Sequence, residues 1–295
     1  MEVLRTVDDM QVHADGARQE GQSLALVPTL GALHEGHLAL VRTALEEADH
    51  VTVSVFVNPT QFGPDEDYDD YPRDLEGDKE KLKALGVDAL FAPPVEEMYP
   101  YADDESRQLS GPLAWVGVDR LDETLCGAYR DDHFRGVTTV VTKLFHACKP
   151  DIGVFGKKDA QQYVILKHLV EDLLFDIDIV GGATVREADG LAQSSRNAYL
   201  DDAEREQATV LYEAVTAARE AVEGGEQDAQ AVVRAMDTAL ATAPDAEVEY
   251  AEVVDAHTLQ PIDHLAPGEE VLAAVAVYFG DTRLIDNAFV QVPTA

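Results

Sequence analysis

Cysteine is almost absent from this chain, since Cys126 and Cys148 are the only two among 295 residues. Two isolated cysteines are too few for a disulfide scaffold or for a zinc cluster built on thiolates. Long apolar runs are missing as well, because no stretch reaches the roughly twenty residues that a membrane-spanning helix needs. The first residues also lack a basic segment followed by an apolar one, so no export signal is expected. We therefore expect a protein of the reducing cytoplasm with no membrane partner.

Basic residues are the second scarcity. The chain has 22 Lys and Arg against 57 Asp and Glu, which gives a formal net charge of -35. So negative a protein repels nucleic-acid phosphates and anionic lipid head groups. We therefore expect small-molecule partners and no nucleic acid.

Apolar segments of strand length alternate with segments of helical period over the first part of the chain. This alternation is typical of βα units that form a mostly parallel sheet. The expected strands are 23–27, 51–57, 88–92, 152–155 and 177–180, and the expected helices begin near residue 36 or cover 137–148 and 161–174. The fold class is therefore predicted to be α/β, with a Rossmann-like doubly wound sheet in a catalytic domain of residues 1–183.

The composition changes after residue 183, which predicts a second, smaller α+β domain over 184–295 that acts as a lid. Residues 201–223 and 228–243 are predicted to form exposed acidic helices, separated by a break at the glycine pair 224–225. Strands are expected at 248–254, 271–279 and 283–289. The apolar run 271–279 suggests a homodimer interface, although an internal strand explains it equally well.

The segment P-T-L-G-A-L-H-E-G-H, residues 28–37, joins an expected strand to an expected helix. Such a joint places backbone N–H groups and the positive end of a helix dipole where an anion can bind, and phosphate is the obvious candidate. Gly31 and Gly36 would let the backbone approach a phosphate closely, and His34 and His37 could each donate a hydrogen bond to it. By itself an H-x-x-H pattern can equally be a loop with two exposed histidines. No metal site is expected, because a zinc pair on a helix usually has spacing i, i+4 and a third ligand.

This joint resembles the signature of the pantoate-β-alanine ligase (pantothenate synthetase) family, which is related to the nucleotidylyltransferases with an H-I-G-H motif and to class I aminoacyl-tRNA synthetases. Further segments resemble the same family in the same order. They are VFVNPTQF (55–62), YPR (71–73), HFRGV (133–137), KPD (149–151), FGKKDAQQ (155–162) and DGLAQSSRN (189–197). The resemblance thus extends over nearly the whole first domain and the start of the second.

The resemblance implies a reaction in two steps. Pantoate attacks the α-phosphate of ATP bound with Mg²⁺, giving pantoyl adenylate and pyrophosphate, and the amine of β-alanine then displaces AMP. It also implies a homodimer and no tightly bound cofactor. By resemblance His37 is the proton donor, with His34 beside it, and Lys158 is the third catalytic residue.

The expected ATP site combines the joint after the first strand with cationic segments further along the chain. Lys158 and Arg196 have the charge needed to neutralise a triphosphate, and residues 194–196 resemble the family's mobile phosphate loop. The whole expected set is Leu30, Gly31, Ala32, Leu33, His34, Glu35, Gly36, His37, Gly156, Lys157, Lys158, Asp159, Val185, Gln193, Ser194, Ser195 and Arg196.

The expected acid-binding residues are led by Gln61 and Gln162, whose neutral amides can hold hydroxyl and carboxylate groups without acting as nucleophiles. The weaker candidates are Asn58, Tyr71, Arg130 and His133. The chain departs from the family pattern at four places. Leu30 replaces a methionine, Lys157 replaces an acid, Gln193 replaces an apolar residue, and the pair 131–132 is Asp-Asp instead of Pro-Gly.

Two alternatives stay open at this point. Another nucleotidylyltransferase with an H-x-G-H motif could adenylylate a different small acid, but it would not be expected to share Gln61 and Gln162. A nucleotide sensor without activity should have lost His34, His37 or Lys158, and all three are present.

Overall fold

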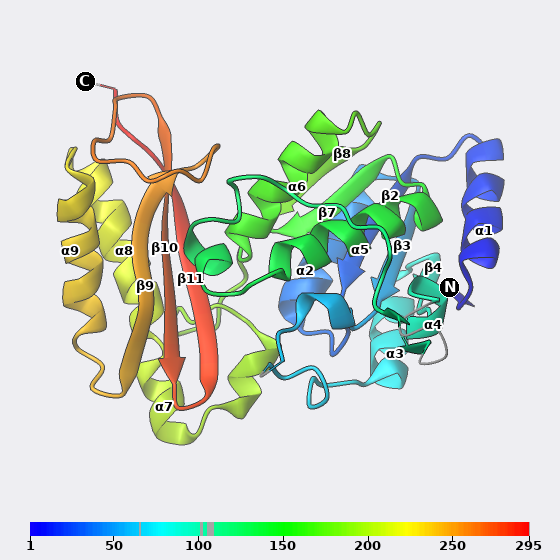
Figure 1. The fold of residues 1–295 in the computed structure, drawn as a ribbon, viewed down its shortest axis with the longest axis horizontal. Helices are drawn as coiled ribbons and strands as arrows, with labels where there is room; N and C mark the ends of the chain where they lie inside the picture. The colour runs from blue at the N-terminus through cyan, green and yellow to red at the C-terminus, as the bar shows by residue number, and fades with distance from the viewer. Residues whose placement is uncertain (65, 101–102, 105–108, 295) are drawn as a thin grey trace. The chain divides into compact units, whose positions relative to one another are not determined.

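The computed structural model describes residues 1–64, 66–100, 103–104 and 109–294 (Figure 1). The chain divides into two compact units. Unit 1 comprises Met1–Val118, Arg130–Lys157 and Ile165–Ala183, and unit 2 comprises Asp119–Tyr129, Lys158–Val164 and Thr184–Ala295. The segments 119–129 and 158–164 therefore belong to the same unit as the C-terminal part of the chain. The domain boundary predicted after residue 183 had placed both segments in the first domain.

Unit 1 is built on a six-stranded parallel sheet with the order β1-β4-β3-β2-β7-β8. The strands are β1 (Glu2–Leu4), β2 (Leu24–Thr29), β3 (His50–Val55), β4 (Ala89–Phe91), β7 (Ile152–Gly156) and β8 (Asp178–Gly182). Their residues are mostly buried, as expected for a parallel sheet that is covered on both faces.

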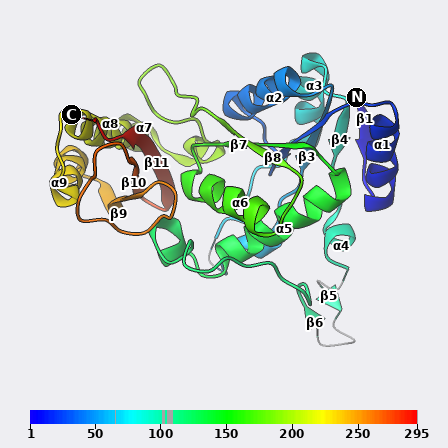
Figure 2. The same ribbon diagram turned by 90° about the horizontal axis from the view of Figure 1, so that it is seen from above.

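Helices cover both faces of this sheet, which confirms the doubly wound α/β prediction (Figure 2). Helices α2 and α3 lie on one face, and α5 and α6 lie on the other. The helices are α1 (Val7–Gln19), α2 (Glu35–Glu47), α3 (Leu75–Leu85), α4 (Val95–Met98), α5 (His133–Cys148) and α6 (Ala160–Asp172). A short 3-10 turn, η1 (Pro59–Gln61), follows β3, and a two-stranded ribbon joins β5 (Asp103–Asp104) to β6 (Leu109–Ser110).

The order in which strands are added to the sheet reverses between the parallel neighbours β2 and β7, in the middle of the sheet. From β2 the chain continues to β3 and β4 on one side, whereas β7 and β8 extend the other side. Ligands of open α/β sheets bind beyond the carboxyl ends of the strands at such a switch point. Here those ends are Thr29 and Gly156.

Unit 2 is an antiparallel sheet with the order β11-β10-β9, packed against two helices. Its elements are η3 (Leu125–Ala128), η4 (Ser195–Tyr199), α7 (Asp202–Gln207), α8 (Val210–Glu223), α9 (Ala229–Leu240), β9 (Ala246–Asp255), β10 (Glu270–Phe279) and β11 (Thr282–Gln291). This smaller α+β unit agrees with the predicted class of the C-terminal part.

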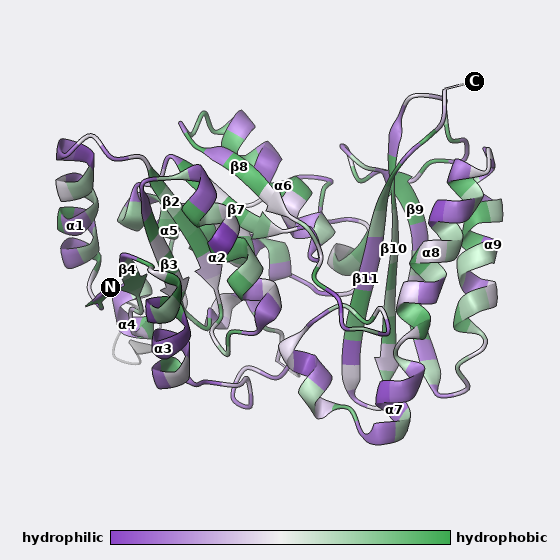
Figure 3. Ribbon diagram, turned by 180° about the vertical axis from the view of Figure 1, so that it is seen from behind, coloured by the Kyte–Doolittle hydropathy of each residue, from purple (hydrophilic) through white to green (hydrophobic). Residues whose placement is uncertain are grey.

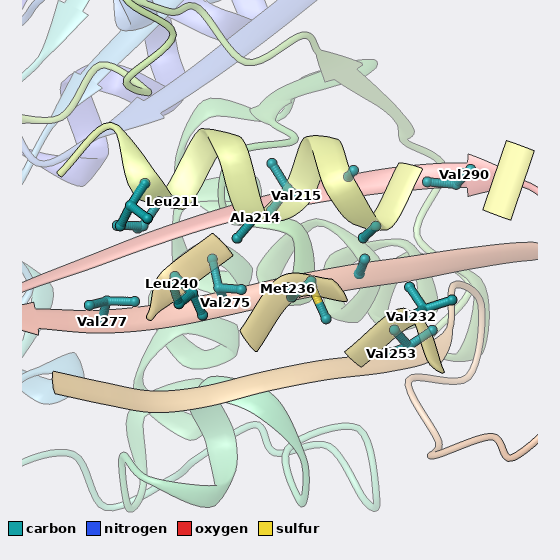
Figure 4. Packing of buried hydrophobic residues seen from close by; sticks show 14 of the residues in the cluster. Leu211, Ala214, Val215, Val232, Met236, Leu240, Val253, Val275, Val277 and Val290 are labelled. Carbon is teal, nitrogen blue, oxygen red and sulfur yellow. The ribbon is translucent and has the colours of Figure 1, made fainter. Parts of the chain in front are cut away.

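The prediction of exposed helices in unit 2 was confirmed for α7, in which no residue is buried, but it was wrong for α8 and α9. Residues of α8 and α9 pack between the two helices and the sheet, among them Leu211, Val215, Met236 and Leu240 (Figure 4). Hydrophilic and hydrophobic residues alternate in bands along both helices (Figure 3). The acidic residues mark only the solvent side of each helix, and alanine and valine at helical spacing form the buried side.

The apolar run 271–279 is the central strand β10, hydrogen-bonded to β9 and β11 along its length. Val271 to Val277 are all buried within unit 2 itself. This run therefore gives no support to a dimer interface. Among the described residues, no helix has the length and apolar character required to cross a membrane.

Candidate active site

The loop after β2 is held by a buried carboxylate from α3. Asp78 is 0% exposed and accepts hydrogen bonds from the backbone nitrogens of Ala32 at 2.9 Å and Leu33 at 2.7 Å. Gly31 has φ of 91°, and a Cβ atom there would lie 2.9 Å from Cγ1 of Val55. Glycine is therefore required at this turn for both its backbone conformation and the close packing.

This arrangement corrects one part of the expected phosphate site. The N–H groups of Ala32 and Leu33 donate to Asp78, and that of Gly31 donates to the Thr29 hydroxyl at 3.2 Å. Backbone donors that bind side chains of the protein do not form a phosphate cradle. The loop instead sets the position at which α2 begins.

His34 and His37 form the first turn of α2. The Gly36 nitrogen donates to Nδ1 of His34 at 3.2 Å, and the His34 nitrogen donates to Nδ1 of His37 at 3.4 Å. Because Nδ1 is the acceptor in each ring, this network assigns the proton of each neutral imidazole to Nε2. The two ring centroids are 4.1 Å apart. The start of α2 therefore carries two imidazole rings with Nε2–H donors, at the helix end whose dipole favours an anion.

The side chain of Glu35, between these histidines, is directed to another partner. It is exposed and forms an ion pair with Arg42, about two turns further along α2. Hydrogen bonding to Arg42 lowers the pKa of Glu35, so the carboxylate stays ionised at neutral pH.

A second cluster in unit 1 surrounds Gln61. The Asn58 side chain is 0% exposed, and its Oδ1 accepts hydrogen bonds from the Tyr99 hydroxyl at 2.8 Å and the Thr60 hydroxyl at 3.0 Å. Its Nδ2 therefore donates, to Oε1 of Gln61 at 3.0 Å and to the Gly136 carbonyl at 3.2 Å. Burial raises the pKa of Tyr99 to about 12, which keeps its hydroxyl a donor.

These contacts orient the amide of Gln61. Since Oε1 of Gln61 accepts from Asn58, its Nε2 is the atom that can donate to a ligand. A donor at this position suits a carboxylate or hydroxyl oxygen. Gly136 is needed nearby, because a Cβ atom there would lie 2.1 Å from the Thr60 carbonyl oxygen.

Arg130 and His133 also contact this turn. His133 Nδ1 lies 2.8 Å from the Gln61 carbonyl oxygen, and Arg130 Nη1 lies 3.1 Å from His133 Nε2. Arg130 is paired with both carboxylate oxygens of Glu66, at 2.6 and 2.8 Å. Partial burial would raise the pKa of Glu66, but the hydrogen bonds and charge of Arg130 outweigh it and lower that pKa.

The two aspartates that depart from the family pattern lie away from these contacts. Asp131 and Asp132 are both exposed, and Asp132 pairs with Arg135 at 3.4 Å. Asp132 has φ of 59°, a left-handed conformation that glycine adopts without strain and aspartate tolerates. Tyr71 is buried and packs edge-on against Phe62 at 5.8 Å, so it supports the loop that carries Gln61.

The expected site residues within segment 156–162 are divided between the two units. Gly156 ends β7 and Lys157 follows it, both in unit 1, and the Lys157 nitrogen donates to the Gly182 carbonyl at 2.9 Å. Lys158, Asp159 and Gln162 belong to unit 2. The Lys158 ammonium lies 3.9 Å from Asp159, and its side chain is 22% exposed.

Gln161 is a buried residue outside the set of expected site residues. Its Nε2 donates to the carbonyls of Leu121 at 2.9 Å and Thr124 at 2.8 Å, and its Oε1 accepts from Gly127 at 3.3 Å. These bonds fasten segment 119–129 to the start of α6 within unit 2. Gln162, the next residue, is only partly buried.

Residues 185–193 form a closed loop that leads into Ser194. The Gln193 nitrogen donates to the Val185 carbonyl at 2.9 Å, and the Glu187 nitrogen donates to the Leu191 carbonyl at 2.8 Å. Arg205 pairs with Glu187 at 2.7 Å and with Asp189 at 2.9 Å on this loop. Ser194 then caps η4, its hydroxyl accepting from the Arg196 nitrogen at 3.3 Å. Ser194, Ser195 and Arg196 are all partly exposed.

Within the described part of the chain, no group of three or more His, Cys, Asp or Glu side chains could hold a metal ion. Within unit 1, the imidazole donors at the start of α2 and the oriented amide of Gln61 have the chemistry to bind oxygen atoms of an anion.

Comparison with known proteins agrees with this chemistry. The family model described as "Pantoate-beta-alanine ligase" matches residues 2–289. The chain is 81% identical over 295 residues to a pantothenate synthetase of Salinibacter ruber, covering 100% of this chain and 99% of that protein.

Two solved structures are also similar. The crystal structure of pantothenate synthetase from Thermus thermophilus has a TM-score of 0.89 and 42% identity, covering 99% of this chain and 100% of that chain. A pantoate-beta-alanine ligase from Francisella tularensis, complexed with beta-gamma ATP and beta-alanine, has a TM-score of 0.77 and 30% identity, covering 98% and 97%. The chain is therefore an enzyme that belongs to the pantoate-beta-alanine ligase family.

Proposed function

We propose that this enzyme condenses pantoate with β-alanine in two steps at the expense of ATP. In the first, a pantoate carboxylate oxygen attacks the α-phosphorus of Mg-ATP, the bond to the β-phosphate oxygen breaks, and pyrophosphate leaves. In the second, the β-alanine nitrogen attacks the acyl carbon of pantoyl adenylate. The carbon-oxygen bond breaks, AMP leaves and the amine loses a proton. Membership of the family and the ATP and β-alanine bound by the Francisella relative support this proposal.

The observation that carries the proposal is the pair of Nε2–H donors on His34 and His37. Negative charge builds on the bridging oxygen and on the leaving pyrophosphate during the first step. Fixed donors and the positive end of α2 stabilise charge that develops there, with no reorganisation at the moment of reaction. We assign His37 as the proton donor, with His34 beside it.

Gln61 and Gln162 are assigned to pantoate. The Asn58 contact leaves the Nε2 of Gln61 as a donor toward an oxygen of the acid. This orientation favours a carboxylate or hydroxyl over a group that must itself donate. Arg130 and His133 support Gln61 through its carbonyl oxygen, so we assign them to the position of this side chain.

Lys158, Ser194, Ser195 and Arg196 are assigned to the triphosphate. Cations and hydroxyls neutralise and orient the phosphates, and the Mg²⁺ that enters with ATP shares this task. Gly156, Val185 and Gln193 are assigned to the nucleotide site as well, Gly156 next to the ribose and phosphates. The enzyme is further proposed to be a homodimer. Light scattering that gives the mass of two chains would agree, and a mass near 32.1 kDa would reject it.

The adenylate can be tested with pantoate that carries ¹⁸O in its carboxylate. In the proposed mechanism one carboxylate oxygen bridges to phosphorus and stays there when the acyl-oxygen bond breaks. Mass spectrometry should therefore find one ¹⁸O in AMP and the other in the amide product. AMP without label would refute acyl adenylation. Release of ADP and phosphate in place of AMP and pyrophosphate would refute it as well.

A further inference from the structure

Two adjacent polar residues interrupt the apolar strand β11 of unit 2. Asp286 is 2% exposed and Asn287 is 7% exposed, although the strand otherwise contributes Leu284, Ala288 and Val290 to the core. Burying a polar or charged side chain costs free energy unless it is hydrogen-bonded. Neighbouring residues of a strand point to opposite faces of the sheet, so the two side chains serve different partners.

Asn287 holds the segment that carries Lys158. Its Nδ2 donates to the Lys158 carbonyl oxygen at 2.7 Å. On the same face of β11, Phe289 packs edge-on against Tyr163, which lies in the same segment of unit 2, with ring centroids 6.4 Å apart. The backbone of Lys158 is therefore set against β11 by a short hydrogen bond and by nearby packing.

Asp286 holds the loop that leads to Ser194. Its carboxylate forms a bidentate pair with Arg186, at 2.5 and 2.9 Å, and Arg186 donates to the Gly190 carbonyl at 3.0 Å. The Arg186 guanidinium lies 4.6 Å from the ring centroid of Tyr212 on α8. Gly190 has φ of 97°, and a Cβ atom there would lie 2.1 Å from the Tyr212 ring. The loop that contains Gly190 therefore packs tightly against Arg186 and Tyr212.

The two residues are also joined to each other. Asp286 Oδ1 accepts a hydrogen bond from the backbone nitrogen of Asn287 at 2.7 Å. A single dipeptide therefore connects the Lys158 segment with the loop that precedes residues 194–196, all within unit 2. We infer that Asp286 and Asn287 are positioning residues that fix Lys158 and the Ser194–Arg196 loop relative to each other for ATP. This inference rests on the proposed function, which assigns both segments to the triphosphate.

The geometry explains why a buried ion pair is placed here. Hydrophobic residues of similar volume would fill the space with comparable stability, but they would not fix the direction of a backbone carbonyl or a loop. Misplacing a phosphate-binding group by about 1 Å can cost about 10²-fold in rate. The Asp286–Arg186 ion pair should therefore affect the rate of the ATP-dependent step more than the stability of the fold.

The test compares Asn287→Asp and Asn287→Ala with the control Gln291→Ala. Asn287→Asp keeps the shape of the side chain but replaces the donor with a carboxylate oxygen. Gln291 lies on the same strand, and its amide likewise donates to backbone carbonyls, of Gly268 at 2.8 Å and Glu269 at 2.9 Å. Thermal unfolding and pantoate-dependent exchange of pyrophosphate with ATP are measured for each variant.

Both Asn287 variants should lower the maximal exchange rate about 10- to 100-fold and raise the KM for ATP, with the KM for pantoate unchanged. Gln291→Ala should leave all three constants unchanged. A lower melting temperature with unchanged kcat and KM would overturn the inference and leave a purely structural role. Absence of exchange in the unaltered enzyme would instead overturn the proposed function.

A second variant covers failure of the Asn287 variants to fold. Arg186→Lys keeps the charge next to Asp286 but loses the bidentate geometry and the bond to Gly190. It should lower the exchange rate and raise the KM for ATP in the same way. If the maximal exchange rate and the KM for ATP of Arg186→Lys equal those of the unaltered enzyme, the inferred role of Asp286 in positioning the loop is overturned.

Discussion

The Asp78 carboxylate accepts a hydrogen bond from the backbone nitrogen of Leu33 at 2.7 Å, across 45 residues of sequence. The same carboxylate binds Ala32, and the Lys81 ammonium lies 3.8 Å away. Burial raises the pKa of Asp78, while the two backbone donors and Lys81 oppose this effect. One buried side chain thus determines where the loop ends and where His34 caps α2.

Replacement of Asp78 by asparagine should therefore weaken both stability and activity. The amide offers one acceptor oxygen in place of two, so one backbone N–H is left unsatisfied, at a cost of about 1 to 3 kcal/mol. The control is Asp74→Asn, which changes the exposed cap of the same helix to a residue that caps equally well. Urea unfolding should show the loss only for Asp78→Asn. Equal stability of the two variants would contradict the role of Asp78.

His37→Ala should lower the rate of adenylation by about 10² or more, because it removes a donor to developing charge. His37→Asn separates this role from capping, since its side-chain oxygen can still accept from the His34 nitrogen. We expect His37→Asn to be as slow as His37→Ala but closer to the unaltered enzyme in melting temperature. Normal turnover in either variant would refute the assignment of His37.

Gln162→Ala should weaken the binding of pantoate far more than that of ATP, because the amide is assigned to the acid. Equilibrium titration with each ligand provides its own control within one variant. Gln161→Ala should behave differently, since the loss of its bonds to segment 119–129 lowers stability. A Gln162 variant that loses ATP and pantoate affinity equally would contradict the assignment.

The His13 and His50 rings meet with their Nε2 atoms 2.9 Å apart. Burial lowers the pKa of His50, and the neighbouring His13 lowers it further. The charge of Asp88 acts in the opposite direction, but the net shift is downward. His13 in turn lies 2.9 Å from Glu2. In the folded protein His50 therefore stays neutral to a lower pH than in the unfolded chain, where it takes up a proton near pH 6.5.

Its contribution to stability is consequently complete above about pH 6.5 and is lost as the pH falls toward the lowered pKa. The slope from this one group reaches at most about 1.4 kcal/mol per pH unit. Urea unfolding at pH 7 and pH 5 should show a larger loss for the unaltered protein than for His50→Gln. Equal losses would show that His50 does not titrate in this way.

The net charge of -35 predicts a strong dependence on salt. Exposed carboxylates such as Asp201, Asp202 and Glu206 repel one another and repel ATP and pantoate. The Debye length falls from about 10 Å at 0.1 M salt to about 3 Å at 1 M, so distant repulsion is screened while short contacts persist. Melting temperature and turnover should both rise between about 0.1 and 1 M KCl. Values that stay flat or fall would show that the excess charge has another cause.

Much of the fold could be predicted because local pattern and burial agree in the central strands. Strands β3 and β7 have the β-branched, apolar composition of buried parallel strands, and they lie within a few residues of the predicted ranges. Helix α1 was not predicted, because only Met10, Ala14 and Ala17 of its thirteen residues are buried and its composition is polar. Helices α8 and α9 were predicted as helices, but their acidic residues concealed the buried face.

The residues that hold the candidate site in place could not be predicted for a different reason. Asp78 acts on a loop 45 residues away, and Glu66 pairs with Arg130 across 64 residues. Neither has a local pattern, since an isolated acid on a helix or loop usually faces water. Asp286 and Asn287 did leave a trace, as two polar residues within a strand whose other residues are mainly apolar.

The central claim is that this enzyme activates pantoate as an adenylate. Exchange of labelled pyrophosphate into ATP, measured without β-alanine and with a panel of small carboxylic acids, tests this claim most directly. We predict exchange that depends on pantoate, and release of AMP together with an amide once β-alanine is added. Exchange with another acid and none with pantoate would contradict the account.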